Sequence, residues 1–407
     1  MSPRPAPEGR WQDVFLVFLR LGLTAFGGPV AHIGYFREAF VVRRRWLDDR
    51  AFADLVALCQ FLPGPASSQV GLSVGLIRAG VPGALAAWTA FTLPSAILMV
   101  VFAYGVGAFG ATAEAGWLHG LKAVAVAVVA QAVWGMARNL APDRERATIA
   151  VAAAVLVTLV DGALIQVAAI MLAGAAGFLL TRERTAETMD HAAMAMPLSR
   201  RAGLLCLGLF AILLVGATVL AAVTDDVILA QAAALYRTGS LVFGGGHVVL
   251  PLLQAEVVDP GWVTEHDFLA GYGAAQAVPG PLFTFAAYVG AVMQTGATGV
   301  FGAVLCLVAI FLPSFLLVFG SLPFWDRIRR RSGARTVMRG VNAGVVGLLA
   351  AALYDPVWTA GVATAADFAV TLVAFLLLMA WKTPPWAVVV LGAAAGAGID
   401  WAGWDGR

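Results

Sequence analysis

The chain has 407 residues, of which 60% are hydrophobic and only 12% are charged, and its mean hydropathy is +0.85. A soluble domain carries charge on about a quarter of its residues, so this composition excludes one and indicates an integral membrane protein. The net charge of +2 is small, and the three cysteines lie apart in apolar stretches, which excludes a disulfide framework, a zinc site and an iron–sulfur site.

Five apolar runs reach the length of about 20 residues that a helix needs to cross a bilayer. They cover residues 84–109, 117–137, 203–223, 298–322 and 363–381. The strands of a membrane barrel would be shorter and would alternate in polarity. Residues 1–10 lack the layout of a secretory signal, and we expect them to form a short disordered tail. The sequence therefore predicts an all-α polytopic membrane protein.

One set of motifs occurs twice in the same order. The matching pairs are RLGLTAFGGP at 20–29 with RTGSLVFGGG at 237–246, QFLPGP at 60–65 with QAVPGP at 276–281, and TLPS at 92–95 with FLPS at 311–314. Their nearly constant offset indicates a tandem duplication. We expect a first repeat at 11–180 and a second at 203–407. The polar linker between them, 181–202, contains several Arg residues, and the positive-inside rule places it in the cytoplasm.

Basic residues indicate how the two repeats are oriented. The arginines at 43–45 and 138–146 have no basic counterpart in the second half, whereas the basic run at 325–335 matches a non-basic stretch of the first. Since loops rich in Lys and Arg are cytoplasmic, we expect inverted-topology repeats, as in many secondary transporters. The segments with the glycine and Pro-Gly-Pro motifs would then be re-entrant helical hairpins broken at Gly and Pro. The alternative is a set of kinked transmembrane helices.

The repeated Pro-Gly-Pro motif predicts an anion site. A helix that begins after Gly64-Pro65 or Gly280-Pro281 directs unpaired N–H groups and the positive end of its dipole into the protein. Two such ends, brought together by inverted symmetry, would form a pocket near the midplane. Hydroxyl groups of the first helical turn would add donors: Ser67, Ser68 and Thr284. The alternative is that the motif only kinks a helix and that these hydroxyls bond back to its carbonyls.

Two arginines, Arg20 and Arg237, each lie six residues before a Phe-Gly-Gly motif and follow apolar sequence. A charge inside a membrane segment costs at least about 2.5 kcal/mol and usually faces a cavity or a partner. No Asp or Glu lies nearby in sequence to pair with either. Because the guanidinium fork suits a tetrahedral oxyanion, we expect both to bind substrate. The alternative for Arg20 is that it snorkels to the headgroups.

Three further polar residues are weaker candidates for substrate contacts. Lys122 is matched by Asn342 in the second repeat and lies in an apolar block, where it binds substrate or snorkels. Gln60 and Gln276 directly precede the two Pro-Gly-Pro motifs. They would satisfy either broken backbone groups or the ligand.

Two histidines follow the glycine motifs, but not in register. His32 and His247 are therefore not expected to have equivalent roles, although histidine titrates in the range that a proton relay needs. The sequence Glu265–Asp267 has the composition of a small metal cluster. A solvated outer loop is the simpler interpretation, and we expect no metal site.

The sequence contains no nucleotide-binding signature, and no soluble domain large enough to hydrolyse ATP. Buried nucleophile–base pairs and carboxylate pairs are also absent from its motifs, so we expect neither an enzyme nor a cofactor, and no nucleic-acid partner. Transport would then use an ion gradient or the membrane potential. The potential favours outward movement of a dianion by about 2.3 kcal/mol per charge at 100 mV.

Four motifs in order, FGGPVAHIGYFREAFVVRRRWL, PGPASSQ, FGGGHVVLPLL and VPGP, resemble the long, two-domain members of the chromate ion transporter family. The resemblance covers both repeats. It implies an inner-membrane exporter of chromate in bacteria or archaea, with sulfate as a related oxyanion. It also implies that the glycine and Pro-Gly-Pro segments are the functional core. The glycines this singles out are Gly27, Gly28, Gly244 and Gly245.

The sequence thus predicts a multi-pass transporter of the inner membrane that exports chromate by alternating access. Transport of sulfate or another oxyanion, and an anion channel of the same architecture, remain alternatives. The spacing of Gly71 and Gly75 permits close helix packing, either within the chain or between two copies in a homodimer.

Overall fold

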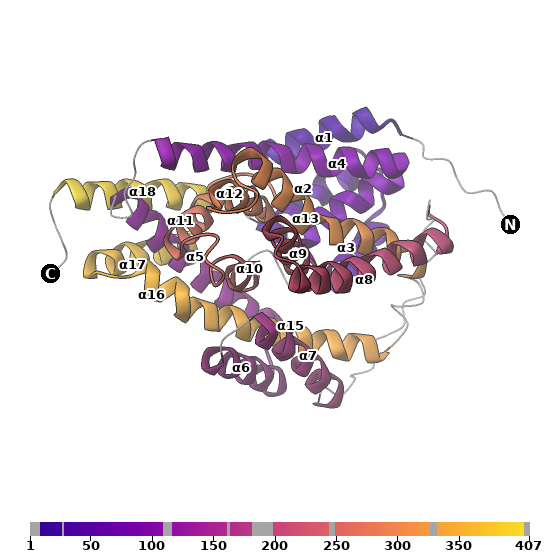
Figure 1. Cartoon of the computed structure of the whole chain (residues 1–407). Coiled ribbons are helices and arrows are strands. Elements are labelled where there is room, and N and C mark those ends of the chain that lie inside the picture. The colour runs from indigo at the N-terminus through magenta and orange to yellow at the C-terminus, as the bar shows by residue number, and fades with distance from the viewer. Residues whose placement is uncertain are drawn as a thin grey trace.

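The computed structural model describes residues 9–26, 28–108, 116–160, 163–180, 198–243, 249–325 and 332–402, which form helices and no β-strand (Figure 1). The first half contains α1 (Trp11–Thr24), α2 (Gly28–Arg37), the π-helical η1 (Glu38–Arg43), α3 (Asp49–Phe61), α4 (Ala66–Ala108), α5 (Gly116–Leu140), α6 (Arg144–Leu159) and α7 (Ala163–Leu180). The expected all-α fold is confirmed. Residues 1–8 and 181–197, which hold most of the predicted tail and linker, lie outside the described residues.

The second half opens with an additional long helix, α8, before its first short one. Its elements are α8 (Arg200–Val223), α9 (Val227–Leu241), α10 (Val249–Val257), α11 (Glu265–Ala275), η3 (Leu282–Thr284), α12 (Phe285–Val292), α13 (Gly299–Ser321), η4 (Leu322–Phe324), α15 (Ser332–Ala352), η5 (Leu353–Trp358), α16 (Thr359–Gly361), α17 (Ala365–Met379) and α18 (Pro385–Trp401).

Among the described residues, five helices are long and apolar enough to cross a membrane: 66–105, 116–140, 200–223, 299–324 and 336–355. The most apolar 18-residue window of α8 has no buried residue, although its mean hydropathy is 2.7. A helix so apolar and so exposed needs a non-aqueous environment, because water would not solvate its surface. The expected membrane protein is therefore confirmed.

The segments with the glycine and Pro-Gly-Pro motifs form short helices. α1 has 14 residues, α3 has 13 and α10 has 9, so at 1.5 Å per residue none spans a hydrocarbon core of about 30 Å. The long helix α4 is itself broken, because Ala79 and Gly80 have non-helical backbone angles. Its first part therefore belongs with the short helices, and its second part is a long apolar helix.

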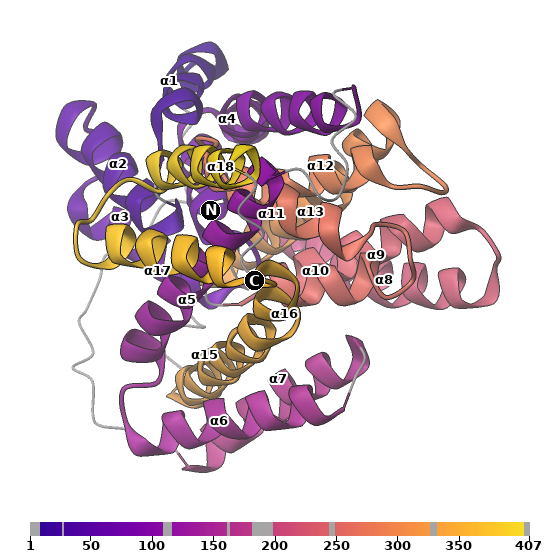
Figure 2. The ribbon, with the colours of Figure 1, turned by 90° about the vertical axis from the view of Figure 1, so that its left-hand side faces the viewer.

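Long helices of each half pack against helices of the other half. α5 of the first half packs against α17 and α18 of the second, while α15 of the second half packs against α6 and α7 of the first. Figure 2 shows α15 lying along α6 and α7. The short helices pack locally, α1 on α4 and α9 on α13.

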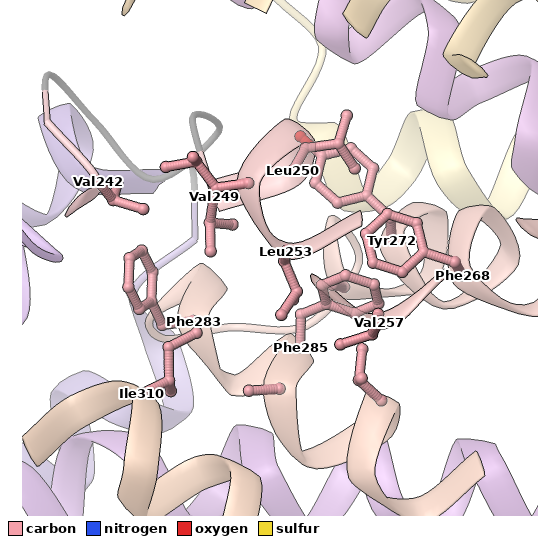
Figure 3. Close-up of a cluster of buried hydrophobic side chains, with 14 of the residues drawn as sticks. Val242, Val249, Leu250, Leu253, Val257, Phe268, Tyr272, Phe283, Phe285 and Ile310 are labelled. Carbon is pink, nitrogen blue, oxygen red and sulfur yellow. The ribbon is translucent and has the colours of Figure 1, made fainter. Parts of the chain in front are cut away.

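The largest apolar cluster of the described residues surrounds the short helices of the second half and also contains side chains of α4, α5, α6 and α7; Figure 3 shows its second-half part. Val242, at the end of α9, lies there beside Phe283 and Ile310, and each of these side chains is at most 1% exposed. Side chains from α10 and α11 complete the cluster. This packing holds Val242 in place at the end of α9.

Candidate functional site

Both Pro-Gly-Pro motifs lie in breaks between short helices, and their glycines have left-handed backbone angles. Gly64 lies between α3 and α4 with φ of 120°, and Gly280 lies between α11 and η3 with φ of 101°. Positive φ values are readily adopted only by glycine. The motif therefore interrupts a helix and turns the chain, which a proline kink alone does not do.

Each Pro-Gly-Pro motif is hydrogen-bonded to the opposite half of the chain. The Gly64 N–H donates to the carbonyl of Val242, at 2.6 Å, and the Gly280 N–H donates to the carbonyl of Ala25, at 2.9 Å. Ala25 follows α1 and Val242 follows α9, so the two acceptors occupy matching places. We call the set Ala25, Gly64, Val242 and Gly280 the motif crossing.

A histidine connects the two sides of the motif crossing. The Ala25 carbonyl only accepts, so the His32 Nε2 atom, 3.1 Å away, carries the proton and donates to it. The Nδ1 atom of His32 then accepts from the Ser67 hydroxyl, at 3.3 Å. His32 and Ser67 are buried. The chain Gly280–Ala25–His32–Ser67 therefore links one Pro-Gly-Pro motif to the first turn of α4, directly after the other.

Serines of the two Leu-Pro-Ser motifs lie against the glycines of the opposite half. A Cβ atom at Gly64 would lie 2.7 Å from the Ser314 Oγ atom, and one at Gly280 would lie 2.8 Å from the Ser95 Oγ atom. Both serines are buried. These two serines were not predicted as site residues from the sequence. A hydroxyl repeated beside a proline inside an apolar helix was the signal that was missed.

Several buried polar atoms near the motif crossing have no hydrogen-bond partner among the described residues. They are the hydroxyls of Ser68, Thr92 and Ser314 and the Oε1 atom of Gln69. Buried polar groups in proteins are nearly always paired. Hydroxyl groups and the free N–H groups at the start of α4 together offer the donors that an oxyanion requires.

The two Pro-Gly-Pro motifs continue differently. After Pro65, α4 begins at once with Ala66, whereas after Pro281 a 3₁₀ turn, η3, precedes α12. The Thr284 hydroxyl is buried and donates back to the Pro281 carbonyl, at 2.8 Å. The structure thus contains one regular α-helical N-terminus at the crossing, where the sequence suggested two.

The two predicted arginines have different surroundings. Arg20 is exposed on α1 and forms no ion pair with a described residue. Arg237, half-buried on α9, forms a two-pronged ion pair with Glu256 of α10, and it also donates to the Thr218 hydroxyl, at 3.2 Å. No acidic residue is close to Arg237 in the sequence, but the fold brings Glu256 to it.

The remaining candidates divide between the crossing and other places. Gln60 is exposed, while Gln276 is partly buried with an unpaired Nε2 atom. Lys122 is buried on α5 and lies within the electrostatic reach of Asp367 and Glu265, in a separate charged cluster. Gly28 has φ of 74° at the start of α2. Four predicted site residues lie outside the described residues: Gly27, Gly244, Gly245 and His247.

Comparisons with known proteins match this chain to transporters. The family described as "Chromate transporter" matches it twice, over residues 12–178 and 229–397. The chain is 31% identical to "Chromate transport protein" of Pseudomonas aeruginosa, over 96% of this chain and 92% of that protein. It is 27% identical to "Probable chromate transport protein" of Synechococcus elongatus, over 94% of each. No solved structure matches it.

Proposed function

The chain belongs to the chromate transporter family, and on that premise we propose that it exports chromate across the inner membrane by alternating access. The repeats at 11–180 and 203–407, joined by the linker at 181–202, would be inverted in the membrane. Alternating access would then move one repeat against the other around a shared site. The reciprocal hydrogen bonds of the motif crossing support this, since they join matching places of the two halves.

The proposed substrate site is the motif crossing with its unpaired hydroxyls. Chromate and sulfate are tetrahedral dianions that accept hydrogen bonds, and buried donors without a partner are costly unless a ligand satisfies them. Ser68 and Ser314 supply such hydroxyls, and the first turn of α4 supplies N–H groups. Gly64 lets the Ser314 hydroxyl lie close to the backbone, because a Cβ atom there would be 2.7 Å from the Ser314 Oγ atom. The unpaired Ser314 hydroxyl is the observation on which this proposal depends most.

Arg20 and Arg237 would serve the site from two sides. The exposed guanidinium of Arg20 attracts the dianion by long-range electrostatics. Arg237 is neutralised by Glu256 and would become available to the anion only if that pair opened. Outward movement follows the membrane potential, which favours each exported negative charge by about 2.3 kcal/mol at 100 mV.

Transport by reconstituted serine variants tests the proposed site. Ser314→Ala should raise the KM for chromate in proteoliposomes, while its unfolding temperature stays equal or rises, because an unpaired buried hydroxyl is removed. Ser321→Ala on the same helix is the matched control, since its buried hydroxyl is already bonded to the Leu317 carbonyl. Unchanged chromate kinetics in Ser314→Ala would remove Ser314 from the site.

Competition among oxyanions decides the substrate. Chromate, sulfate and molybdate should be compared as competitors of labelled chromate in the same vesicles. Strong preference for sulfate would assign the alternative substrate. Flux that does not saturate would indicate a channel instead of a carrier.

A further inference from the structure

An acidic cavity of about 530 Å³ lies apart from the residues of the motif crossing. It is bounded by the ends of α6, α7, α10 and α15 together with η5 and the first residue of α11. The described residues that line it include three carboxylates and no Lys, Arg or His: Asp259, Glu265 and Asp355. A dianion would be repelled there, so the cavity is not a second site for chromate.

The cavity runs from an exposed rim to a buried amide. Tyr354 and Asp355 are exposed at the rim, so water reaches it. Gln166, which is only 9% exposed, lines the cavity with an Oε1 atom that has no partner among the described residues. Its Nε2 atom donates to the Pro251 carbonyl, at 3.4 Å. A buried amide oxygen without a donor indicates that the cavity holds a hydrogen-bonding occupant.

The charged groups around Glu265 decide what the occupant is. Burial raises the pKa of Glu265 and the negative charge of Asp355 raises it further, against the opposing positive charge of Lys122 on α5. Behind Lys122 lie Asp367 of α17 and His119, whose Nδ1 atom is 3.6 Å from an Asp367 carboxylate oxygen. On α11 itself, Glu265 is followed by His266 and Asp267.

A proton fits these surroundings better than a metal ion. Within the described ranges, no group of three or more His, Cys, Asp and Glu side chains is arranged to hold a metal. Two neighbouring carboxylates repel each other, and one bound proton removes that repulsion. The exposed rim at Tyr354 and Asp355 lets a proton enter the cavity from water.

The residues that line the cavity lie at helix ends that are opposite to the basic, cytoplasmic loops. α6 begins at Arg144 beside the basic loop at 138–146, and its far end, with Val157 and Thr158, lines the cavity. The loop at 258–264 that leads to Glu265 contains no Lys or Arg. By the positive-inside rule the cavity then opens to the outside.

We propose that this cavity is a proton-binding site in which Glu265, with Asp355 in the same lining, binds one proton drawn from the outer side. The Glu265 carboxylate forms an O–H bond with a proton taken from hydronium, which leaves as water. The role of this proton rests on the proposed function, because the proton would move inward as the counter-ion while the protein exports a dianion. Each cycle would carry three charges down the membrane potential.

The site is tested in proteoliposomes that contain chromate and a pH-sensitive dye. Outward flow of chromate should acidify the lumen with the wild-type protein, and Glu265→Gln should abolish this acidification. Exchange of labelled for unlabelled chromate should persist in Glu265→Gln, because exchange requires no net proton movement. Asp49→Asn is the matched control: Asp49 occupies the aligned position at the start of α3, but it is exposed and paired with Arg37.

An infrared titration of the detergent-solubilised protein gives an answer that does not depend on transport. An infrared band of a protonated carboxyl group should titrate in the wild type and in Asp49→Asn. The band should be absent in Glu265→Gln and shifted in Asp355→Asn. Equal bands in all four proteins, or unchanged acidification by Glu265→Gln, would overturn the proton site. A wild-type protein that moves chromate without acidifying the lumen overturns this inference alone, whereas one that moves no oxyanion overturns the proposed function.

Discussion

Arg237 and Glu256 form a two-pronged ion pair between α9 and α10, with the Arg237 Nε atom 2.9 Å from Oε1 of Glu256. The pair brackets the glycine motif at 243–246, since one partner precedes it and the other follows it. It therefore holds the ends of this segment together. The matching Arg20 in the first half is exposed and forms no such pair with any residue that the structure describes.

Breaking this ion pair should destabilise the protein. Arg237→Ala leaves a largely buried carboxylate unpaired, and the free energy of unfolding should fall by about 2 kcal/mol, less than the ~3–5 kcal/mol of a fully buried pair. The double variant Arg237→Ala/Glu256→Ala should recover part of this loss. Thermal unfolding in detergent measures the effect, with Arg20→Ala as a control that keeps its stability. Equal losses in both arginine variants would contradict the structural role.

Arg20→Ala should affect transport without affecting stability, unlike Arg237→Ala. Because Arg20 is exposed, its removal should reduce chromate uptake while the unfolding temperature is unchanged. The loss should be greatest at low ionic strength, where long-range attraction is least screened. Uptake at the wild-type rate at low salt would exclude Arg20 from the transport path.

The glycines of the motif crossing should tolerate no side chain. Alanine at Gly64 or Gly280 needs a strained backbone, at about 1–2 kcal/mol or more, and its Cβ atom would contact a serine hydroxyl at less than 3 Å. Both variants should lose transport and stability. Gly135→Ala is the control, since it is helical with open space around it. Active Gly280→Ala would show that the crossing rearranges freely.

Cysteine labelling tests the inverted topology. In a background without Cys59, Cys206 and Cys306, single cysteines at Arg44 and Pro260 should react with impermeant reagents from opposite sides of the membrane. Both positions are exposed, and they occupy matching places in the two halves. Labelling of both from the same side would exclude inverted repeats.

The pH dependence of stability should reveal the cap of α6. Asp143 accepts a hydrogen bond from the Arg146 N–H, at 2.9 Å, and the hydrogen-bonded Arg146 guanidinium holds the pKa of Asp143 below its ordinary value. A lowered pKa means that the stabilisation is present at neutral pH and is lost as pH falls through the folded-state pKa. Asp143→Ala should cost about 0.5–1 kcal/mol at neutral pH, because the cap is exposed. The difference from wild type should vanish in acid.

The sequence predicted the membrane class, four of the long apolar helices and the positions of the breaks, because each follows from local composition. The expected span at 363–381 was wrong, since it forms the short helix α17, and the long apolar helix at 336–355 was missed. Apolar runs specify spans, and Gly64 and Gly280 specify turns, whatever the rest of the chain does. The partners of these breaks were not predictable in the same way. Gly64 bonds to a backbone carbonyl, Val242, and every residue has a carbonyl, so no side chain marks the acceptor.

Pairings across large sequence separations were missed for a related reason. Glu256 lies 19 residues after Arg237, and only the fold of α9 and α10 brings them together. Sequence alignment of the halves suggested equal roles for Gln60 and Gln276, but the first is exposed and the second is partly buried. Matching motifs thus do not guarantee matching environments, since the surrounding helices differ in length and packing.

Through the reciprocal hydrogen bonds of the motif crossing, each half of the chain supplies a hydrogen-bond acceptor that the other half requires. A first half produced by itself would hold Gly64 with no Val242 to receive its N–H, and α5 without α17 and α18 to cover it. In a dimer of two such halves, the Gly64 N–H of each copy would have to donate to the Ala25 carbonyl of the other instead of to Val242. In the fused chain the two halves are covalently linked, so no dimer has to form. Corresponding residues of the two halves can then differ in environment, as Arg20 and Arg237 do.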